Sequence, residues 1–335
     1  MSIETGRVHQ WGNTKNNSEA SVAALMAPIK VDGLTRRYGD VVANDGVTFT
    51  VEAGEVFGYL GPNGAGKTTT IRTLMGLQSP TAGTARVLGA DVRDERALVA
   101  ARRRIGYLPA SPAFDEGATG REILDLHASL KGDRRRDELL ALFDPPLDRK
   151  VREYSTGNVQ KLGLIQAFVH DPDLVILDEP TSGLDPLMQQ RFNEFVREER
   201  DAGTTVFFSS HVLSEVRRVC DRVAILRDGR LLTIEDVETL LDRSGKFVRV
   251  RLAGDAEAVD LDRNGVHDPQ VSTVTGAQLA DGADAGTVTE VTFTFTGDVN
   301  DLVGAFAGHR LLDLDLQEAP LEDVFMRFYG EGTDA

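Results

Sequence analysis

The chain has 335 residues, which is enough for one large domain with its own core and a smaller second domain. Its 53 acidic residues outnumber its 37 lysines and arginines, and the resulting net charge of −16 argues against general binding to nucleic acid or anionic lipid. The sequence has neither an apolar run of about 18 residues nor a signal-peptide pattern, so we expect a soluble protein that is not secreted. Cys220, the single cysteine, excludes an internal disulfide and fits a reducing cytosol.

The N-terminal residues differ in character from the rest of the chain. Residues 1–28 are polar and without periodicity, which predicts either a disordered tail or a true start of translation further on, at Met26. A strand-like run begins at Ile29 and leads into a turn at 37–40, and the alternation over 47–51 is typical of a half-buried strand. We therefore expect the first ordered domain to begin at residue 29.

A glycine-rich run that fits the pattern G-x-x-x-x-G-K-[ST] lies between a strand-like run at 55–60 and a helical pattern at 69–77. Glycines let consecutive backbone N–H groups turn toward one anion, and a helix that begins there adds its positive end. Lys67 would reach the terminal phosphates of a nucleotide, and the Thr68 hydroxyl would bind magnesium. The run predicts a triphosphate site, and its members are Gly61, Pro62, Asn63, Gly64, Ala65, Gly66, Lys67, Thr68 and Thr69.

The middle of the chain reads as an α/β domain with a helical insertion. Residues 112–170 are mainly helical, with a loop at 144–146, and resemble an insertion between two halves of a sheet. The short apolar runs 174–177 and 206–208 are typical of strands buried on both faces of a parallel sheet. A strand followed by a tight turn at 224–230 closes this domain near residue 240.

The C-terminal part has another pattern. Residues 247–252 and 291–295 alternate strictly between apolar and polar side chains, which predicts a sheet with one solvated face. We expect a separate small α+β unit over 241–335. The segment 253–286 between these strands is rich in Asp, Gly and Ala, and this predicts a flexible loop.

Two acids follow the buried strand at 174–177. The carboxyl ends of parallel strands meet at the edge of the sheet where nucleotides bind. Asp178 would hold magnesium there, directly or through water, and Glu179 would polarise the attacking water. A strand that ends in solvated acids is the alternative, but the neighbouring phosphate loop favours the catalytic interpretation.

A second helix start could also hold an anion. Ser155 is placed as the N-cap of a helix whose apolar residues Leu162, Ile165 and Val169 follow helical spacing, and Gly157 permits close approach of a ligand. An ordinary capped helix explains the same residues, and this segment taken alone favours that interpretation, because serine caps are common.

Taken together, five motifs in this order resemble those of the ATP-binding subunit of an ABC transporter, and they span residues 29 to about 240. They are 61–69, 154–161, 174–180, 182–185 and 209–211. The residues 160–190 and the ending 321–325 most resemble ATPases of the ABC-2 exporter type. The resemblance implies a P-loop NTPase fold over 29–240, with a mostly parallel core sheet, an antiparallel β subdomain and a helical insertion at about 112–170.

The resemblance also assigns roles to residues outside the phosphate loop. It implies that Tyr38 stacks on adenine, that His211 contacts the γ-phosphate and the attacking water, and that Asp185 lies across a dimer seam. Glu179, His211 and Lys67 would then carry catalysis, with Thr68 and Asp178 as metal ligands. The signature motif, which would contact the γ-phosphate held by the opposite subunit, consists of Ser155, Thr156 and Gly157.

The implied cofactors are ATP and Mg²⁺, and the implied partners are a second ATPase subunit, as a homodimer, and a polytopic membrane permease. No nucleic acid is expected. ATP hydrolysis would power export through the permease, which would place the chain in the cytoplasm, on the inner face of the cell membrane. Two alternatives are a soluble ABC ATPase without a transport role and a nucleotide-gated regulatory module.

Two departures from the family pattern bear on these expectations. Ala110, followed by Ser111, stands where the family places a glutamine in the loop after the strand-like run 105–109. An alanine can neither ligate magnesium nor orient water, so the metal contact would shift to Ser111 or to water, or be lost. The signature carries Thr156 for a glycine and Asn158 for a glutamine, a variation that the exporter subgroup tolerates.

Overall fold

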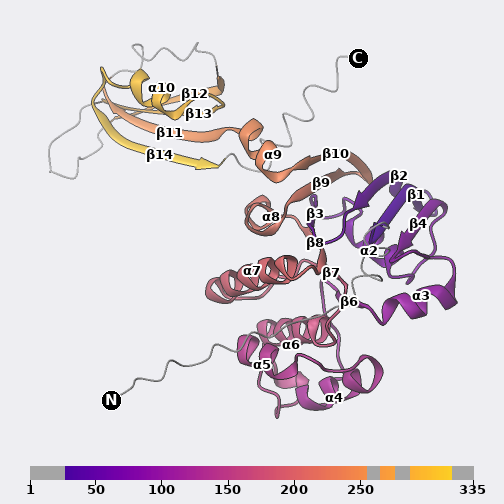
Figure 1. Ribbon diagram of the computed structural model, residues 1–335. Helices are drawn as coiled ribbons and strands as arrows, with labels where there is room; N and C mark the ends of the chain where they lie inside the picture. The colour runs from indigo at the N-terminus through magenta and orange to yellow at the C-terminus, as the bar shows by residue number, and fades with distance from the viewer. Residues whose placement is uncertain (1–26, 255–264, 276–286, 319–335) are drawn as a thin grey trace, which may run out of the picture.

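The computed structural model describes residues 27–254, 265–275 and 287–318 (Figure 1). The expectations for the N-terminal tail up to residue 26 and for 321–325 lie outside the described residues. Within the described part, strands form three sheets, two of which belong to the segment before residue 240. In the same part, no helix is long and apolar enough to cross a membrane.

The central sheet has the strand order β10-β9-β3-β8-β7-β6, and all neighbours are parallel except β10, which runs antiparallel to β9. Its strands are β3 (Val56–Leu60), β6 (Ile105–Leu108), β7 (Leu174–Asp178), β8 (Thr205–Ser210), β9 (Arg222–Arg227) and β10 (Arg230–Asp236). Every residue of β3, β7 and β8 is buried. A parallel sheet covered on both faces requires such continuous apolar runs, which explains why the sequence does not alternate here.

Helices cover one face of this sheet, as Figure 1 shows, and a second sheet covers the other. The helices are α6 (Thr156–Phe168), α7 (Pro186–Asp201) and α8 (Leu213–Val219), whereas α2 (Lys67–Leu74) and α3 (Glu95–Arg102) lie on the side of the second sheet. Neighbouring residues of one strand enter different cores: Val206 and Phe208 pack with the helices, and Phe207 packs with the second sheet.

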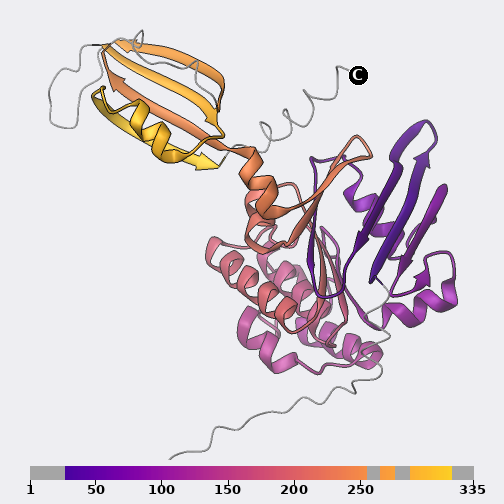
Figure 2. The same ribbon diagram turned by 45° about the horizontal axis from the view of Figure 1, so that its top comes forward.

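The second sheet is antiparallel, with the order β2-β1-β4-β5, and stands beside the central one (Figure 2). Its strands are β1 (Ile29–Tyr38), β2 (Val41–Val51), β4 (Ala82–Val87) and β5 (Ala90–Asp91). Phe49 of β2 stacks on Phe57 of β3 with ring centroids 5.6 Å apart, and it also stacks on Phe207 of β8 at 5.9 Å. Aromatic pairs at this separation add to the apolar area they bury, so they fix the second sheet against the first.

Between β6 and β7 the chain forms the predicted helical insertion. Its elements are α4 (Gly120–Lys131), α5 (Arg136–Phe143), the 3₁₀ turn η1 (Val151–Glu153) and α6. Thr119 and Glu122 form a capping box at the start of α4, which satisfies free N–H groups of its first turn. Phe143 of α5 and Phe168 of α6 both pack edge-on against Phe195 of α7, so the insertion shares the core of the central sheet.

The C-terminal unit is an antiparallel sheet of order β12-β13-β11-β14, joined to the rest by α9 (Val237–Ser244) (Figure 1). It consists of β11 (Lys246–Ala253), β12 (Val266–Thr275), β13 (Thr287–Phe295), α10 (Val299–Ala305) and β14 (Leu311–Glu318). Part of the segment 253–286, in which the sequence predicts flexible loop, forms β12, which pairs with β13. Its side chains described over 267–273 are all exposed, so no apolar pattern revealed this edge strand.

Two histidines are buried where α4 meets the end of α6. The rings of His127 and His170 lie 5.4 Å apart, and His170 Nε2 donates to the backbone oxygen of Ile105 at 3.2 Å. Burial, together with the neighbouring charge of Lys131, lowers the pKa of His127 to about 4 and that of His170 to about 3. Because protonation would place a cation in this apolar, already cationic contact, both rings are neutral at neutral pH.

The buried histidine pair predicts acid sensitivity. Both folded-state pKa values lie below the ordinary value of 6.5, so the unfolded chain binds more protons, and stability is present above pH 6.5 and lost as the pH falls toward 4. The double variant His127→Gln/His170→Gln should flatten this dependence by on the order of 1 to 2 kcal/mol per ring at pH 5. Urea unfolding followed by circular dichroism at several pH values measures it. An equal slope in both proteins contradicts the assignment.

Candidate functional site

The phosphate loop connects β3 to α2. Pro62, Asn63 and Gly64 form its exposed tip, and Gly66 is the N-cap of α2, with a left-handed φ of 99°. A Cβ at Gly66 would lie 2.4 Å from the backbone oxygen of Ala43, so the position requires glycine on two grounds. The loop therefore presents the free N–H groups of the first turn of α2, which is the arrangement that binds phosphate groups.

Lys67 is the first residue of α2, and its side chain is buried beneath the loop. Its ammonium donates to the backbone oxygens of Gly61 at 2.7 Å and Pro62 at 3.3 Å. It also pairs with Oε1 of Glu179 at 3.3 Å. A buried ammonium with this set of oxygen partners is placed to exchange them for phosphate oxygens.

Asp178 ends β7 and is fully buried. Its Oδ2 accepts a hydrogen bond from Thr68 Oγ1 at 2.9 Å, and its Oδ1 accepts one from Ser209 Oγ at 2.5 Å. A carboxylate beside a hydroxyl supplies the hard oxygen donors that magnesium prefers, so the two residues predicted as metal ligands fit that ion. Ser209, which sequence reasoning missed as a site residue, faces Asp178 in the register of β7 and β8.

Glu179, Lys67 and His211 lie in one cluster. Oε2 of Glu179 contacts Nδ1 of His211 at 2.7 Å, while its Oε1 pairs with Lys67. Glu179 has a left-handed φ of 51°, which is uncommon for a residue with a side chain, and its N–H donates to the backbone oxygen of Ser209 at 3.2 Å. Such backbone strain concentrates at functional sites, and here it turns the carboxylate toward the phosphate loop.

The signature segment and Asp185 lie at two helix starts. Ser155 caps α6 and accepts from the N–H of Asn158 at 3.3 Å, and Asp185 caps α7 and accepts from that of Met188 at 3.0 Å. Both capping residues are exposed, as is Thr156. Ser155 and Asp185 therefore each cap their own helix, and within the described residues no hydrogen bond or ion pair joins any of these three to the Lys67 cluster.

The two helix starts touch through glycines. A Cβ at Gly157 would lie 2.7 Å from the backbone oxygen of Gly183, which itself has a left-handed φ of 76°. Thr156, which stands where the family has a glycine, packs against the same residue. This contact links the start of α6 to the segment that follows Glu179.

Tyr38 lies at the end of β1 and is 44% exposed. Its hydroxyl donates to Oε1 of Gln78, and the guanidinium of Arg36 lies 4.6 Å from the centroid of its ring. Gln78 also donates to the backbone oxygen of Thr69 at 2.7 Å. The tyrosine predicted to stack on adenine is thus held from two sides and tied to α2, and neither Arg36 nor Gln78 was identified from the sequence.

The loop after β6 carries Ala110, which is half-buried, and Ser111, which is exposed. Burial and, to a lesser degree, the charge of Asp178 raise the pKa of the Tyr107 hydroxyl in β6. The side chain of Ala110 has no oxygen or nitrogen atom that could bind a metal. Thr68 and Asp178, the two residues predicted as metal ligands, contact each other at this edge of the sheet.

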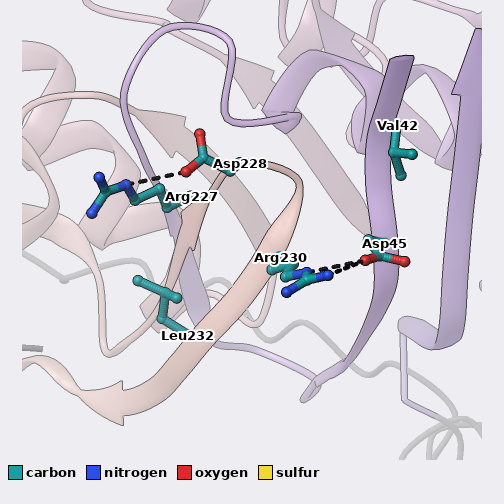
Figure 3. A pocket seen from close by; sticks show the side chains of 6 residues that line it. All are labelled: Val42, Asp45, Arg227, Asp228, Arg230 and Leu232. Carbon is teal, nitrogen blue, oxygen red and sulfur yellow. Dashed lines mark hydrogen bonds and ion pairs between the residues drawn. The ribbon is translucent and has the colours of Figure 1, made fainter. Parts of the chain in front are cut away.

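A separate hollow of about 500 Å³ lies between β2 and the β9–β10 turn (Figure 3). Arg230 of β10 pairs with Asp45 of β2 across it at 2.9 Å, and Arg227 pairs with its neighbour Asp228 at 3.2 Å. The turn supports the phosphate loop from behind, since the N–H of Gly229 donates to the backbone oxygen of Ala65 at 3.2 Å. We assign this hollow no ligand, because its charged side chains already form ion pairs with one another, and its walls support the phosphate loop.

Comparison with known proteins identifies related chains. The family model described as ABC transporter matches residues 44–182. An uncharacterized ABC transporter ATP-binding protein of Nostoc sp. is 36% identical over 297 residues, which cover 85% of this chain and 83% of that protein. The bacitracin transport ATP-binding protein BcrA of Bacillus licheniformis is 33% identical over 315 residues, which cover 91% of this chain and 98% of that protein. The daunorubicin/doxorubicin resistance ATP-binding protein DrrA of Streptomyces peucetius is 40% identical over 233 residues, which cover 67% and 70%.

Solved structures give the same result for the fold. An ATP-binding subunit of an ABC transporter is 32% identical, with a TM-score of 0.59 over 64% of this chain and 92% of that one. A dimeric ATP-binding cassette in a post-hydrolysis state with ADP and Pi has a TM-score of 0.58 over 62% of this chain and 98% of that one, and at 23% identity this likeness concerns the fold alone. The predicted fold class is confirmed.

The glycine contact between the two helix starts can be tested by Gly157→Ala. The added methyl group meets the backbone of Gly183, which cannot rotate away as a side chain would. We expect a loss of about 1 to 3 kcal/mol in the free energy of unfolding, the usual cost of overpacking. Gly304→Ala in α10 is the control, because a Cβ there meets nothing within 4 Å. If urea unfolding shows both variants equally stable, the contact is not tight.

Proposed function

Because this chain belongs to the family of ABC transporter ATP-binding proteins, we propose that it hydrolyses ATP at the phosphate loop and thereby powers export through a separate membrane permease. The observation that carries the site assignment is the cluster of Lys67, Glu179 and His211 beside Asp178. It gathers a cation for phosphate, a carboxylate for water and a metal-binding carboxylate at one edge of the sheet.

The geometry supports in-line attack by water on the γ-phosphate. Thr68 and Asp178 would hold the magnesium ion, which neutralises phosphate charge when bound. A phosphate at the Lys67 ammonium would replace Glu179 as its anionic partner, so the Glu179 carboxylate could turn to the attacking water. His211, at hydrogen-bond distance from that carboxylate, would fix its direction. Positioned charge does most of the work in such a reaction, and covalent catalysis is not needed.

A second copy of the chain would complete each site. Ser155, Thr156 and Asp185 are exposed, so the N-terminal ends of α6 and α7 are accessible to a partner. In a head-to-tail homodimer, Ser155 of one copy would bind the γ-phosphate held by the loop of the other, and Tyr38 would stack on its adenine. Two ATP molecules would then hold the dimer together, and hydrolysis would release it.

The permease and the direction of transport rest on the relatives. The names of BcrA and DrrA describe bacitracin transport and drug resistance, and both are ATP-binding proteins of such systems. We propose the same arrangement here, with residues 29–240 as the ATPase domain on the inner face of the membrane and 241–335 as an accessory domain. A soluble ABC ATPase without a transport role and a regulatory module are not favoured, because these relatives are transport subunits.

Replacing Glu179 tests the catalytic assignment. Glu179→Gln keeps the size of the side chain but removes the charge that accepts a proton from water, so turnover should fall by about 10² to 10⁴-fold while ATP still binds. ATP-dependent dimers should accumulate, as seen by size-exclusion chromatography. Glu194→Gln, on the exposed face of α7, is the matched control. Phosphate release at the normal rate from Glu179→Gln would refute the role of this residue.

Replacing Asp178 tests the metal site. Asp178→Asn keeps an acceptor oxygen but removes the negative charge, so the Mg²⁺ concentration for half-maximal hydrolysis should rise by about 10-fold or more. Asp148→Asn, whose side chain is 83% exposed, should leave that concentration unchanged. Steady-state phosphate release across a magnesium titration gives the answer, and an unchanged midpoint in Asp178→Asn would place the metal elsewhere.

A further inference from the structure

The carboxylate of Glu215 joins two segments that carry the site. Glu215 lies in α8 and accepts one hydrogen bond on each oxygen. Its Oε1 accepts from Thr181 Oγ1 at 2.5 Å, and its Oε2 accepts from Ser210 Oγ at 2.5 Å. Both hydroxyl-bearing residues are buried, at 4% and 0% exposed, and the carboxylate is the nearest acceptor of each, since the other acceptor of Ser210 Oγ, the backbone oxygen of Val212, lies 3.5 Å away.

Each of the two partners is next to a residue of the Lys67 cluster. Ser210 is the last residue of β8 and immediately precedes His211, and Thr181 follows Glu179 by two residues. The backbone oxygen of Ser210 also accepts from the N–H of Gly61, the first residue of the phosphate loop, at 3.2 Å. One carboxylate therefore ties together the strand ends that deliver Glu179 and His211.

The hydrogen bonds that converge on Glu215 are strong for their kind. A carboxylate that accepts from a hydroxyl makes a charge-assisted bond, which is shorter and about twice as strong as a neutral one. Ser210 Oγ is itself fixed, because it accepts from the N–H of Val212 at 2.9 Å. The network holds the turn through His211 between two fixed points, and His211 itself is half-exposed and needs such support.

We propose that Glu215 is a positioning residue for hydrolysis, which holds His211 and Glu179 in their 2.7 Å contact by anchoring Ser210 and Thr181. This rests on the proposed function of the same site. Glu215 bonds to neither the phosphate loop nor Tyr38 through its carboxylate, whose two oxygens are taken up by the hydroxyls. Its loss should therefore act on the rate of the chemical step and leave nucleotide binding unchanged.

The first test is Glu215→Gln in the full chain, with ATP hydrolysis as the readout. An amide has one acceptor oxygen and a donor nitrogen, so it cannot accept from both hydroxyls. A small displacement of catalytic groups costs up to about 10²-fold, so we expect kcat to fall by roughly 10- to 100-fold with KM for ATP unchanged. Ser214→Ala, on the exposed side of the same helix, should behave as the parent protein. An unchanged kcat, or a change in KM alone, overturns the proposal.

The second test separates positioning from a general loss of stability. If Glu215 acts through His211, adding Glu215→Gln to His211→Ala should lower the single-turnover rate little further than His211→Ala alone. Adding Ser210→Ala to His211→Ala should likewise have little further effect. If Glu215→Gln lowers the rate by the same factor in the parent protein and in His211→Ala, Glu215 has a structural role only.

A spectroscopic readout covers the case in which His211→Ala is too slow to follow. The ¹⁵N chemical shift of the His211 ring should move in Glu215→Gln and stay unchanged in Ser214→Ala, because the contact with Glu179 reports on the ring nitrogen. An unmoved shift contradicts the proposal. If the parent chain itself releases no phosphate from ATP, the proposed function fails. If the parent chain is active and the Glu215→Gln variant is equally active, only the role of Glu215 fails.

Discussion

The structure depends on the parallel alignment of β3, β7 and β8, because this alignment brings three loops to one edge of the central sheet. The strands pair in register, so Leu60 lies opposite Ser210 and Asp178 lies opposite Ser209. The phosphate loop follows the first strand, the acid pair ends the second, and His211 follows the third. Burial on both faces fixes that register, since every residue of the three strands is inaccessible to water.

The charged groups at this edge of the sheet are paired within the protein. Lys67 is buried with Glu179 as its ionic partner, and Asp178 is buried with two hydroxyl donors. Charged groups inside a protein need partners, and these partners are ones that a nucleotide and magnesium can replace. In the proposed reaction, the same oxygen and nitrogen atoms that stabilise the fold would become the contacts of the substrate.

The segment that follows Glu179 connects several parts of the site. Gln160 of α6 donates to the backbone oxygen of Pro180 at 2.8 Å, Gly157 abuts Gly183, and Glu215 binds Thr181. The start of α6 and the segment that follows Glu179 are therefore joined by direct contacts. Nothing in this connection is long-range, because each step is a direct contact between neighbouring elements.

The sequence by itself determined the order of the elements, the phosphate loop and the acids after β7, because each of these is a local pattern whose chemistry depends on spacing along the chain. It also located the helix cap Ser155, whereas the cap that Asp185 provides for α7 was not predicted. It did not reveal β12, whose side chains over 267–273 are exposed and lack an apolar period, nor Ser209, Gln78 and Glu215 as parts of the site. Those residues acquire their roles from partners 31, 40 and 34 positions away in the chain, and only the packing of strands and helices brings such distant side chains within hydrogen-bond distance.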